Sequence, residues 1–167
     1  MFVQIFQDAL FAAIAAIGFA AISRPPRQAY LLCAITAAVG HSIRFTLTDG
    51  SIAGLHITAA TLIASAAIGL VAVALSPIAH IPAETCLFPA LLPMIPGMYA
   101  YRMFGGLAYC LFKSNEADFM HYFYLFASNG ATCFCILLCM VTGATLPVFM
   151  FKRISFQATR QDNNDYF

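Results

Sequence analysis

The chain has 167 residues, of which 62% are hydrophobic and only 9% are charged, and its mean hydropathy is +0.84. This composition is far more apolar than that of a typical soluble domain, so it indicates a membrane protein. The formal net charge of +1 leaves no basic patch large enough to follow a phosphate backbone, so we expect no nucleic acid as a partner.

Five apolar runs are each near or above the roughly 20 residues that a helix needs to cross about 30 Å of hydrocarbon. The sequence therefore predicts an all-α polytopic protein in the lipid bilayer, with about five transmembrane helices in one domain over residues 1–151. The first run carries Asp8 and has no basic segment before it, so we interpret it as a retained helix and not as a signal peptide. The predicted spans are 2–22, 29–47, 52–75, 85–112 and 121–149.

Basic residues predict the orientation of these spans. With five spans, one side of the membrane carries more arginine and lysine than the other, and the positive-inside rule assigns that side to the cytoplasm. The amino terminus is then outside, and the polar tail over residues 152–167 is cytoplasmic. The basic residues on the cytoplasmic side are Arg24, Arg27, Lys152, Arg153 and Arg160.

The fourth run, 85–112, contains Pro89, Pro93, Pro96 and Gly97 in its first half. Each proline removes a backbone donor and clashes with the preceding turn, so the run cannot be one straight α-helix. Irregular backbone at membrane depth is tolerated only where it is buried in protein or lines a polar cavity. The sequence thus predicts a proline-broken fourth helix with a site beside the break, and a kink that only helps packing is the alternative.

Depth along the helices suggests what this site contains. At 1.5 Å per residue, Pro93 to Gly97 lie about 12 to 18 Å into the span, close to the midplane. A half-helix that begins near Pro96 would point free N–H groups at the bilayer centre, where discontinuous helices of transporters bind carboxylates. Asn129 and Thr132 fall at a similar depth on the fifth span, so we expect them to receive polar atoms of a substrate or to bond across helices.

Ionisable side chains inside spans are costly, so each is a candidate functional residue. Arg102 follows Gly97 by five residues and could hold a substrate carboxylate or extend to the membrane interface. His41 and Arg44 share one face of the second span, where they could form an outer gate or a proton relay, although His41 could also be a packing residue. Glu84 borders the mouth of the broken span, where it could carry a proton or lie in an interfacial loop.

No arrangement of residues points to catalysis. The six cysteines lie in or at the edges of apolar spans and are interpreted as small hydrophobic residues. Metal-ligand spacing, paired carboxylates and a nucleophile beside a base are all missing from the sequence pattern. We therefore expect no enzyme, no catalytic residue, no bound metal and no cofactor.

Two short motifs accompany the five apolar runs. Residues 24–27 read Arg-Pro-Pro-Arg between the first two spans, and residues 88–97 read Phe-Pro-Ala-Leu-Leu-Pro-Met-Ile-Pro-Gly, with Tyr101 shortly after. Together with the short chain, these motifs resemble the small membrane subunit of the threonine/serine exporter family, the YjjB-like proteins. The resemblance covers roughly residues 5 to 150, and the Pro-Gly run is its most specific part.

The resemblance implies an antiporter of the bacterial inner membrane that exports threonine, serine or small dicarboxylates by ion-coupled alternating access. It also implies a second multi-span membrane subunit as partner. A structural or assembly subunit that supports a separate transport-competent chain remains the alternative. The predicted substrate-binding residues are Pro93, Pro96, Gly97, Tyr101, Arg102, Asn129 and Thr132.

Overall fold

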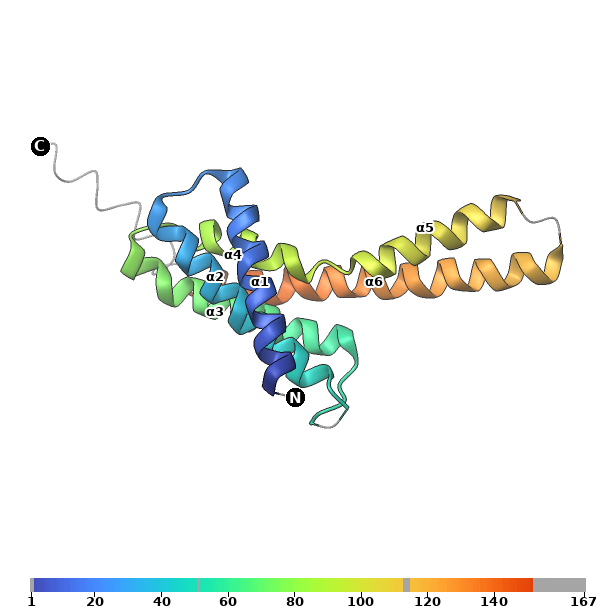
Figure 1. Cartoon of the computed structure of the whole chain (residues 1–167), viewed down its shortest axis with the longest axis horizontal. Coiled ribbons are helices and arrows are strands. Elements are labelled where there is room, and N and C mark those ends of the chain that lie inside the picture. The colour runs from blue at the N-terminus through green and yellow to red at the C-terminus, as the bar shows by residue number, and fades with distance from the viewer. Residues whose placement is uncertain (1, 51, 113–114, 152–167) are drawn as a thin grey trace, which may run out of the picture. The chain divides into compact units, whose positions relative to one another are not determined.

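The computed structural model describes residues 2–50, 52–112 and 115–151 (Figure 1). Within these residues every regular element is a helix, which confirms the all-α prediction. In this described part of the chain, four helices are long and apolar enough to cross a membrane on their own: α1, α2, α3 and α6. The elements are α1 (Phe2–Ser23), α2 (Arg27–Thr48), α3 (Ile57–Ala79), α4 (Ala83–Leu91), the 3-10 helix η1 (Leu92–Met94), α5 (Gly97–Phe112) and α6 (Glu116–Met150).

The predicted break in the fourth span is present. The helix ends in the short η1, and α5 begins at Gly97, as expected for a half-helix that starts near Pro96. Proline lacks an N–H group, and it disfavours helical backbone at Ile95 before it. The carbonyl of Pro96 accepts hydrogen bonds from the N–H groups of Tyr99 and Ala100, both at 3.1 Å, and so starts the new helix.

The chain divides into two compact units. Unit 1 contains the residues up to Met94 together with those from Cys139 onward, and unit 2 contains Ile95–Leu138. Helix α6 contributes residues to both units.

Small residues build the core of unit 1. Ala12, Ala16 and Ala20 recur every four residues along α1 and are buried, and Ala29 and Cys33 are buried on α2. Small side chains let neighbouring helices approach closely, which is how helices pack in a membrane. Helices α3 and α6 meet in the same way, because the Ser65 hydroxyl donates to the Cys139 carbonyl at 3.3 Å and Gly69 faces the backbone of Ala144.

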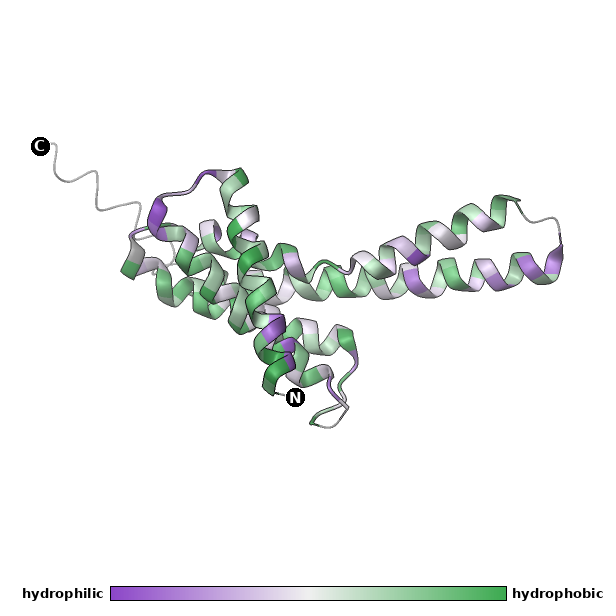
Figure 2. Ribbon diagram, viewed as in Figure 1, coloured by the Kyte–Doolittle hydropathy of each residue, from purple (hydrophilic) through white to green (hydrophobic). Residues whose placement is uncertain are grey.

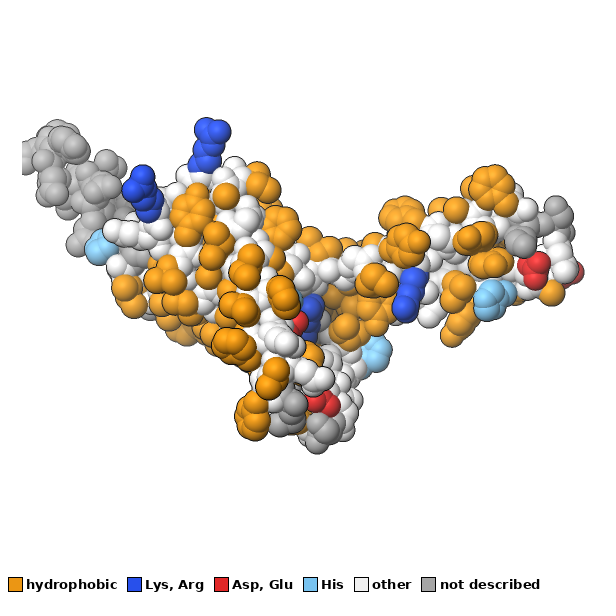
Figure 3. Space-filling view, in the orientation of Figure 1, with side chains coloured by type: hydrophobic (Ala, Val, Ile, Leu, Met, Phe, Trp, Pro, Cys, Tyr) orange, Lys and Arg blue, Asp and Glu red, His pale blue; other side chains and the backbone are white. Residues whose placement is uncertain are grey.

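Large apolar side chains lie on the outside of the helices. Phe6, Phe11 and Ile22 on α1 are each more than two-thirds exposed, and Figure 3 shows hydrophobic side chains spread over the visible face. Hydrophilic residues gather at the connection between α1 and α2 and at the start of α6 (Figure 2). Small residues inside and large apolar residues outside fit a bundle whose solvent is lipid.

Unit 2 is a hairpin of α5 and the first part of α6. Cys110 contacts Phe119, Gly106 contacts Phe126, and Met103 contacts Gly130, so the two helices run antiparallel. The rings of Tyr109 and Tyr122 stack with centroids 4.9 Å apart. Helix α6 has 35 residues, which corresponds to about 52 Å at 1.5 Å per residue.

Candidate functional site

The end of η1, the last part of unit 1 before the break, is held by an arginine from another helix. Arg44 of α2 is half-buried, and its Nη1 donates to the carbonyl oxygen of Met94 at 3.0 Å. Met94 is the last residue of η1, and carbonyl groups at a helix end have no partner within their own helix. The guanidinium therefore satisfies a buried carbonyl group that the break leaves without a helical partner.

One helical turn earlier on α2, His41 forms a second polar contact. Its Nδ1 lies 3.2 Å from Oδ2 of Asp8 on α1, and the residue is only 5% exposed. Its other ring nitrogen, Nε2, is buried and has no hydrogen-bond partner within the described part of the chain. We call Asp8, His41, Arg44 and the Met94 carbonyl the break cluster.

The break cluster is balanced in charge. Buried ionic groups are tolerated only when they are paired and hydrogen-bonded, and here one acidic residue, Asp8, and one basic residue, Arg44, accompany the hydrogen-bonded ring of His41. Asp8 lies four residues before Ala12 on the stripe of α1 that packs inward, so it faces the bundle and not lipid. The side chain of Asp8 is partly exposed at the surface of unit 1, and its carboxylate contacts the buried ring of His41.

Asp8 was not among the predicted site residues, although its spacing along α1 indicates its place. Asp8, Ala12, Ala16 and Ala20 share a spacing of four, which places the acid on the same helical face as the buried alanines. An acidic residue that continues a stripe of small residues is directed at a neighbouring helix. Here the neighbouring helix is α2, and the residue that Asp8 contacts on it is His41.

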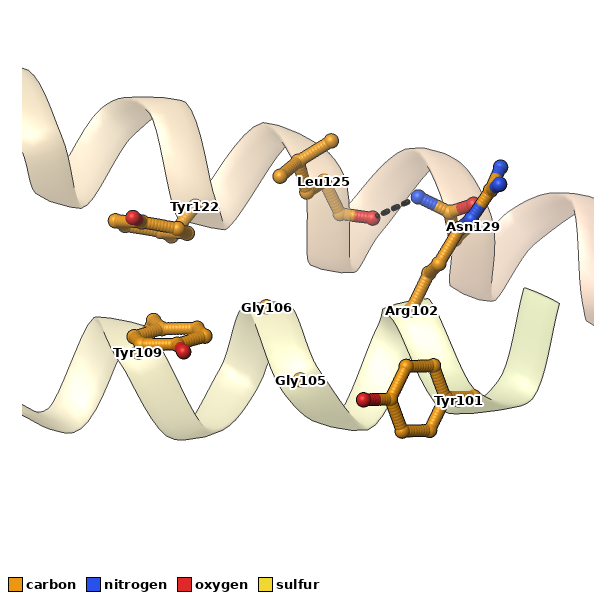
Figure 4. A pocket seen from close by; sticks show the side chains of 8 residues that line it. All are labelled: Tyr101, Arg102, Gly105, Gly106, Tyr109, Tyr122, Leu125 and Asn129. Carbon is orange, nitrogen blue, oxygen red and sulfur yellow. Dashed lines mark hydrogen bonds between the residues drawn. The ribbon is translucent and has the colours of Figure 1, made fainter. Parts of the chain in front are cut away.

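Unit 2 contains a pocket of about 390 Å³ between α5 and α6 (Figure 4). Arg102 of α5 and Asn129 of α6 lie side by side at one end, and Tyr109 stacks on Tyr122 at the other. The amide Nδ2 of Asn129 donates to the Leu125 carbonyl at 2.7 Å, so its Oδ1 is left to accept a hydrogen bond from a ligand. Three of the predicted substrate-binding residues, Tyr101, Arg102 and Asn129, line this pocket.

The other predicted residues do not line that pocket. The N–H of Gly97 donates to the Ile95 carbonyl at 2.8 Å, so this amide is already engaged within the chain. Pro93 lies half-buried in η1, Pro96 is buried, and the Thr132 hydroxyl donates to the Ser128 carbonyl at 2.9 Å. A contact of these residues with substrate stays a prediction.

Glu84 lies apart from the other predicted gating residues. It is exposed in the first turn of α4, ten residues before Met94, which corresponds to about 15 Å along a helix axis. His41 and Arg44, in contrast, share the break cluster as their spacing predicts. Among the described residues, no three His, Cys, Asp or Glu side chains are grouped closely enough to hold a metal ion.

Comparison with known proteins identifies the family. The family profile described as "Threonine/Serine exporter, ThrE" matches residues 8–150. An uncharacterized protein of Haemophilus influenzae is 37% identical over 153 residues, which are 90% of this chain and 48% of that protein. The chain thus spans about half the length of this relative. No solved structure matches the chain. With a match over most of its length, the chain belongs to the threonine/serine exporter family, ThrE.

Proposed function

We propose that this chain is one part of a secondary transporter that exports threonine, serine or small organic acids by ion-coupled alternating access. Membership of an exporter family and four helices able to span a membrane support the proposal. The observation that carries it is the break itself, where Arg44 donates a hydrogen bond to the Met94 carbonyl that has no helical partner. Broken helices and paired ionisable residues inside a bundle mark the transport path in secondary transporters.

In this proposal the pocket of unit 2 recognises the substrate. The planar guanidinium of Arg102 suits a carboxylate because it can donate two parallel hydrogen bonds. Oδ1 of Asn129 accepts from the ammonium or hydroxyl group of an amino acid, and the Tyr101 hydroxyl adds a further donor or acceptor. Thr132 follows Asn129 by one helical turn and extends this polar face.

Pro93, Pro96 and Gly97 have a different part in the proposal. They keep the fourth span from becoming a continuous helix, so the backbone near the break can bond to side chains and substrate. Their chemistry supports this assignment, since two of the three lack an N–H group and the third has no side chain to fill the gap.

The chain is proposed to work with a second multi-span membrane subunit in the bacterial inner membrane. A relative of about twice its length supports a transporter built from two parts. The cluster of Arg24 and Arg27 between α1 and α2 supports a cytoplasmic position for that connection and an outer position for the amino terminus.

Export assays with matched arginine variants test the proposal. Cells that express the chain with its partner are loaded with labelled threonine, serine or succinate, and initial efflux rates are measured over a range of internal concentrations. We expect Arg102→Gln to raise the apparent KM at least tenfold, because the carboxylate loses a charged partner. Arg27→Gln removes an exposed positive charge outside the pocket and should change KM less than twofold.

A second variant tests the break. Changing Pro96 to Ala together with Gly97 to Leu restores helix-forming residues at the interruption, so efflux should be lost while the protein remains in the membrane. Unchanged efflux from this variant, or equal effects of Arg102→Gln and Arg27→Gln, would contradict the proposal.

An assembly role is the second candidate, because this chain spans only half of its relative and the path could lie in the other half. In that case efflux survives replacement of Arg102 and Asn129 but is lost when a packing glycine is enlarged. The same assay on Asn129→Ala and on Gly69→Ala, a packing variant outside the pocket, therefore separates the two functions.

A further inference from the structure

The break cluster contains a site for one proton. When His41 is neutral and its Nδ1–H donates a hydrogen bond to Oδ2 of Asp8, Nε2 carries a lone pair. That nitrogen is buried without a partner in the described chain. A proton added there becomes an N–H group with no acceptor, which is costly in a buried position. The described conformation therefore suits neutral His41, and a protonated His41 favours another conformation.

The charges around His41 are few. Asp8 on α1 and Arg44 on α2 both interact with it electrostatically. Helix α3 carries no charged residue, and the part of α6 in unit 1 carries none either. Glu84 is the charged residue of α4, and it is exposed about 15 Å along the helix from Met94. One proton on His41 therefore changes the cluster from a balanced state to a positive one.

Arg44 connects this change to the break. It follows His41 by three residues, so a positive charge on the ring lies one helical turn from the guanidinium and repels it. This repulsion displaces the guanidinium and so weakens the hydrogen bond that Arg44 makes to the Met94 carbonyl.

We propose that Asp8 and His41 form the proton-coupling site of this exporter, in which a proton bound at Nε2 of His41 loosens the Arg44 tie on the break. The proton reaches Nε2 from one side of the membrane and leaves it to the other side. The Nδ1–H group of His41 stays hydrogen-bonded to the Asp8 carboxylate throughout. Asp8 is a positioning residue, because it orients the ring and stabilises the charge that forms. The inference rests on the proposed transport function and adds the coupling ion and its binding site.

Transport in membrane vesicles tests the coupling. Everted vesicles containing the chain and its natural partner are assayed for serine transport driven by an imposed pH gradient and for serine exchange without a gradient. We expect Asp8→Asn and His41→Gln to lower the ratio of gradient-driven transport to exchange at least tenfold. Glu116→Gln, which neutralises an exposed carboxylate at the start of α6, should leave the ratio within twofold of wild type. A ratio that is unchanged in both cluster variants would overturn the proposal.

A measurement on the purified chain tests the switch independently of transport. Hydrogen exchange is followed at one pH for a peptide covering residues 92–100 in His41→Arg, which carries a permanent charge, and in His41→Gln, which carries none. The charged variant should exchange at least threefold faster. Equal exchange rates would overturn the link between His41 and the break.

The wild-type chain provides a comparison if the charged variant does not fold. After correction for intrinsic exchange, wild type should show faster exchange of this peptide at low pH than at high pH, and His41→Gln should not. A shared pH dependence would again overturn the proposal. If wild-type vesicles transport none of the substrates, the proposed function fails, while the exchange experiment still decides whether the proton switch exists.

Discussion

Gly106 lies where α5 packs closely on the backbone of α6 in unit 2, and replacing it by alanine tests that packing. A Cβ atom at this position would lie 2.8 Å from the backbone nitrogen of Phe126 and 3.0 Å from the Tyr122 carbonyl oxygen. Neither atom belongs to a flexible side chain, so the helices must separate by about 0.6 Å, from 2.8 Å to the 3.4 Å of ordinary contact. Gly105 is the matched control, because a Cβ atom there meets nothing within 4 Å.

The free energies follow from this geometry. Overpacking costs about 1–3 kcal/mol, whereas alanine gains up to about 1 kcal/mol over glycine within a helix. Both variants share the helix term, so Gly106→Ala should be about 1–3 kcal/mol less stable than Gly105→Ala. Unfolding of the purified protein by increasing SDS, followed by tyrosine circular dichroism, measures this difference, since the Tyr109–Tyr122 stack spans the same interface. If Gly105→Ala is the less stable variant, the result contradicts the close contact of Gly106 with the backbone of α6.

Three further substitutions probe unit 1 by the same unfolding measurement. Gly69→Ala would place a Cβ atom 2.5 Å from the Ala144 carbonyl oxygen, whereas a Cβ atom at Gly18 meets nothing within 4 Å. Gly69→Ala should therefore be about 1–3 kcal/mol less stable than Gly18→Ala, and equal stabilities would argue against the contact of α3 with α6. Ser76→Ala should cost about 1 kcal/mol, because the buried hydroxyl donates to the Ile81 carbonyl at 2.6 Å, and an unchanged stability would contradict that bond. His80 ends α3 with φ 54°, so His80→Gly should raise stability by up to about 1 kcal/mol, and a loss would show that the left-handed backbone is not strained.

The break could be predicted from sequence because proline acts locally. A single proline can lie inside a helix, as Pro77 does in α3 and Pro147 does in α6. Pro93 and Pro96 are only three residues apart and remove two backbone donors from one stretch, so together they disfavour a continuous helix, and α5 begins at Gly97 directly after them. The start of the third helix was less predictable, since the apolar run begins at Ile52 but the helix begins at Ile57. The N–H groups of residues 52–54 turn back onto the Asp49 carbonyl, which a count of apolar residues does not detect.

The break cluster could be predicted only in part. The spacing of His41 and Arg44 indicated a shared face, but the partners of that face come from α1 and η1, 33 and 50 residues away in sequence. Depth along a helix carries no information about which neighbour a side chain meets. For this reason depth alone could not distinguish Asn129, which lines the pocket with Arg102, from Thr132, which does not.

The length of α6 has a consequence for the aqueous phase. At about 52 Å the helix exceeds the roughly 40–45 Å of a bilayer with its head groups, even when it is tilted by an average of about 20°. Because its first turn carries the carboxylates of Glu116 and Asp118, we expect this end of the helix to extend into water beyond the lipid. An epitope fused next to Asn115 should therefore be reached by antibodies on intact cells or on everted vesicles, and the preparation that binds them identifies the compartment this end of the hairpin faces.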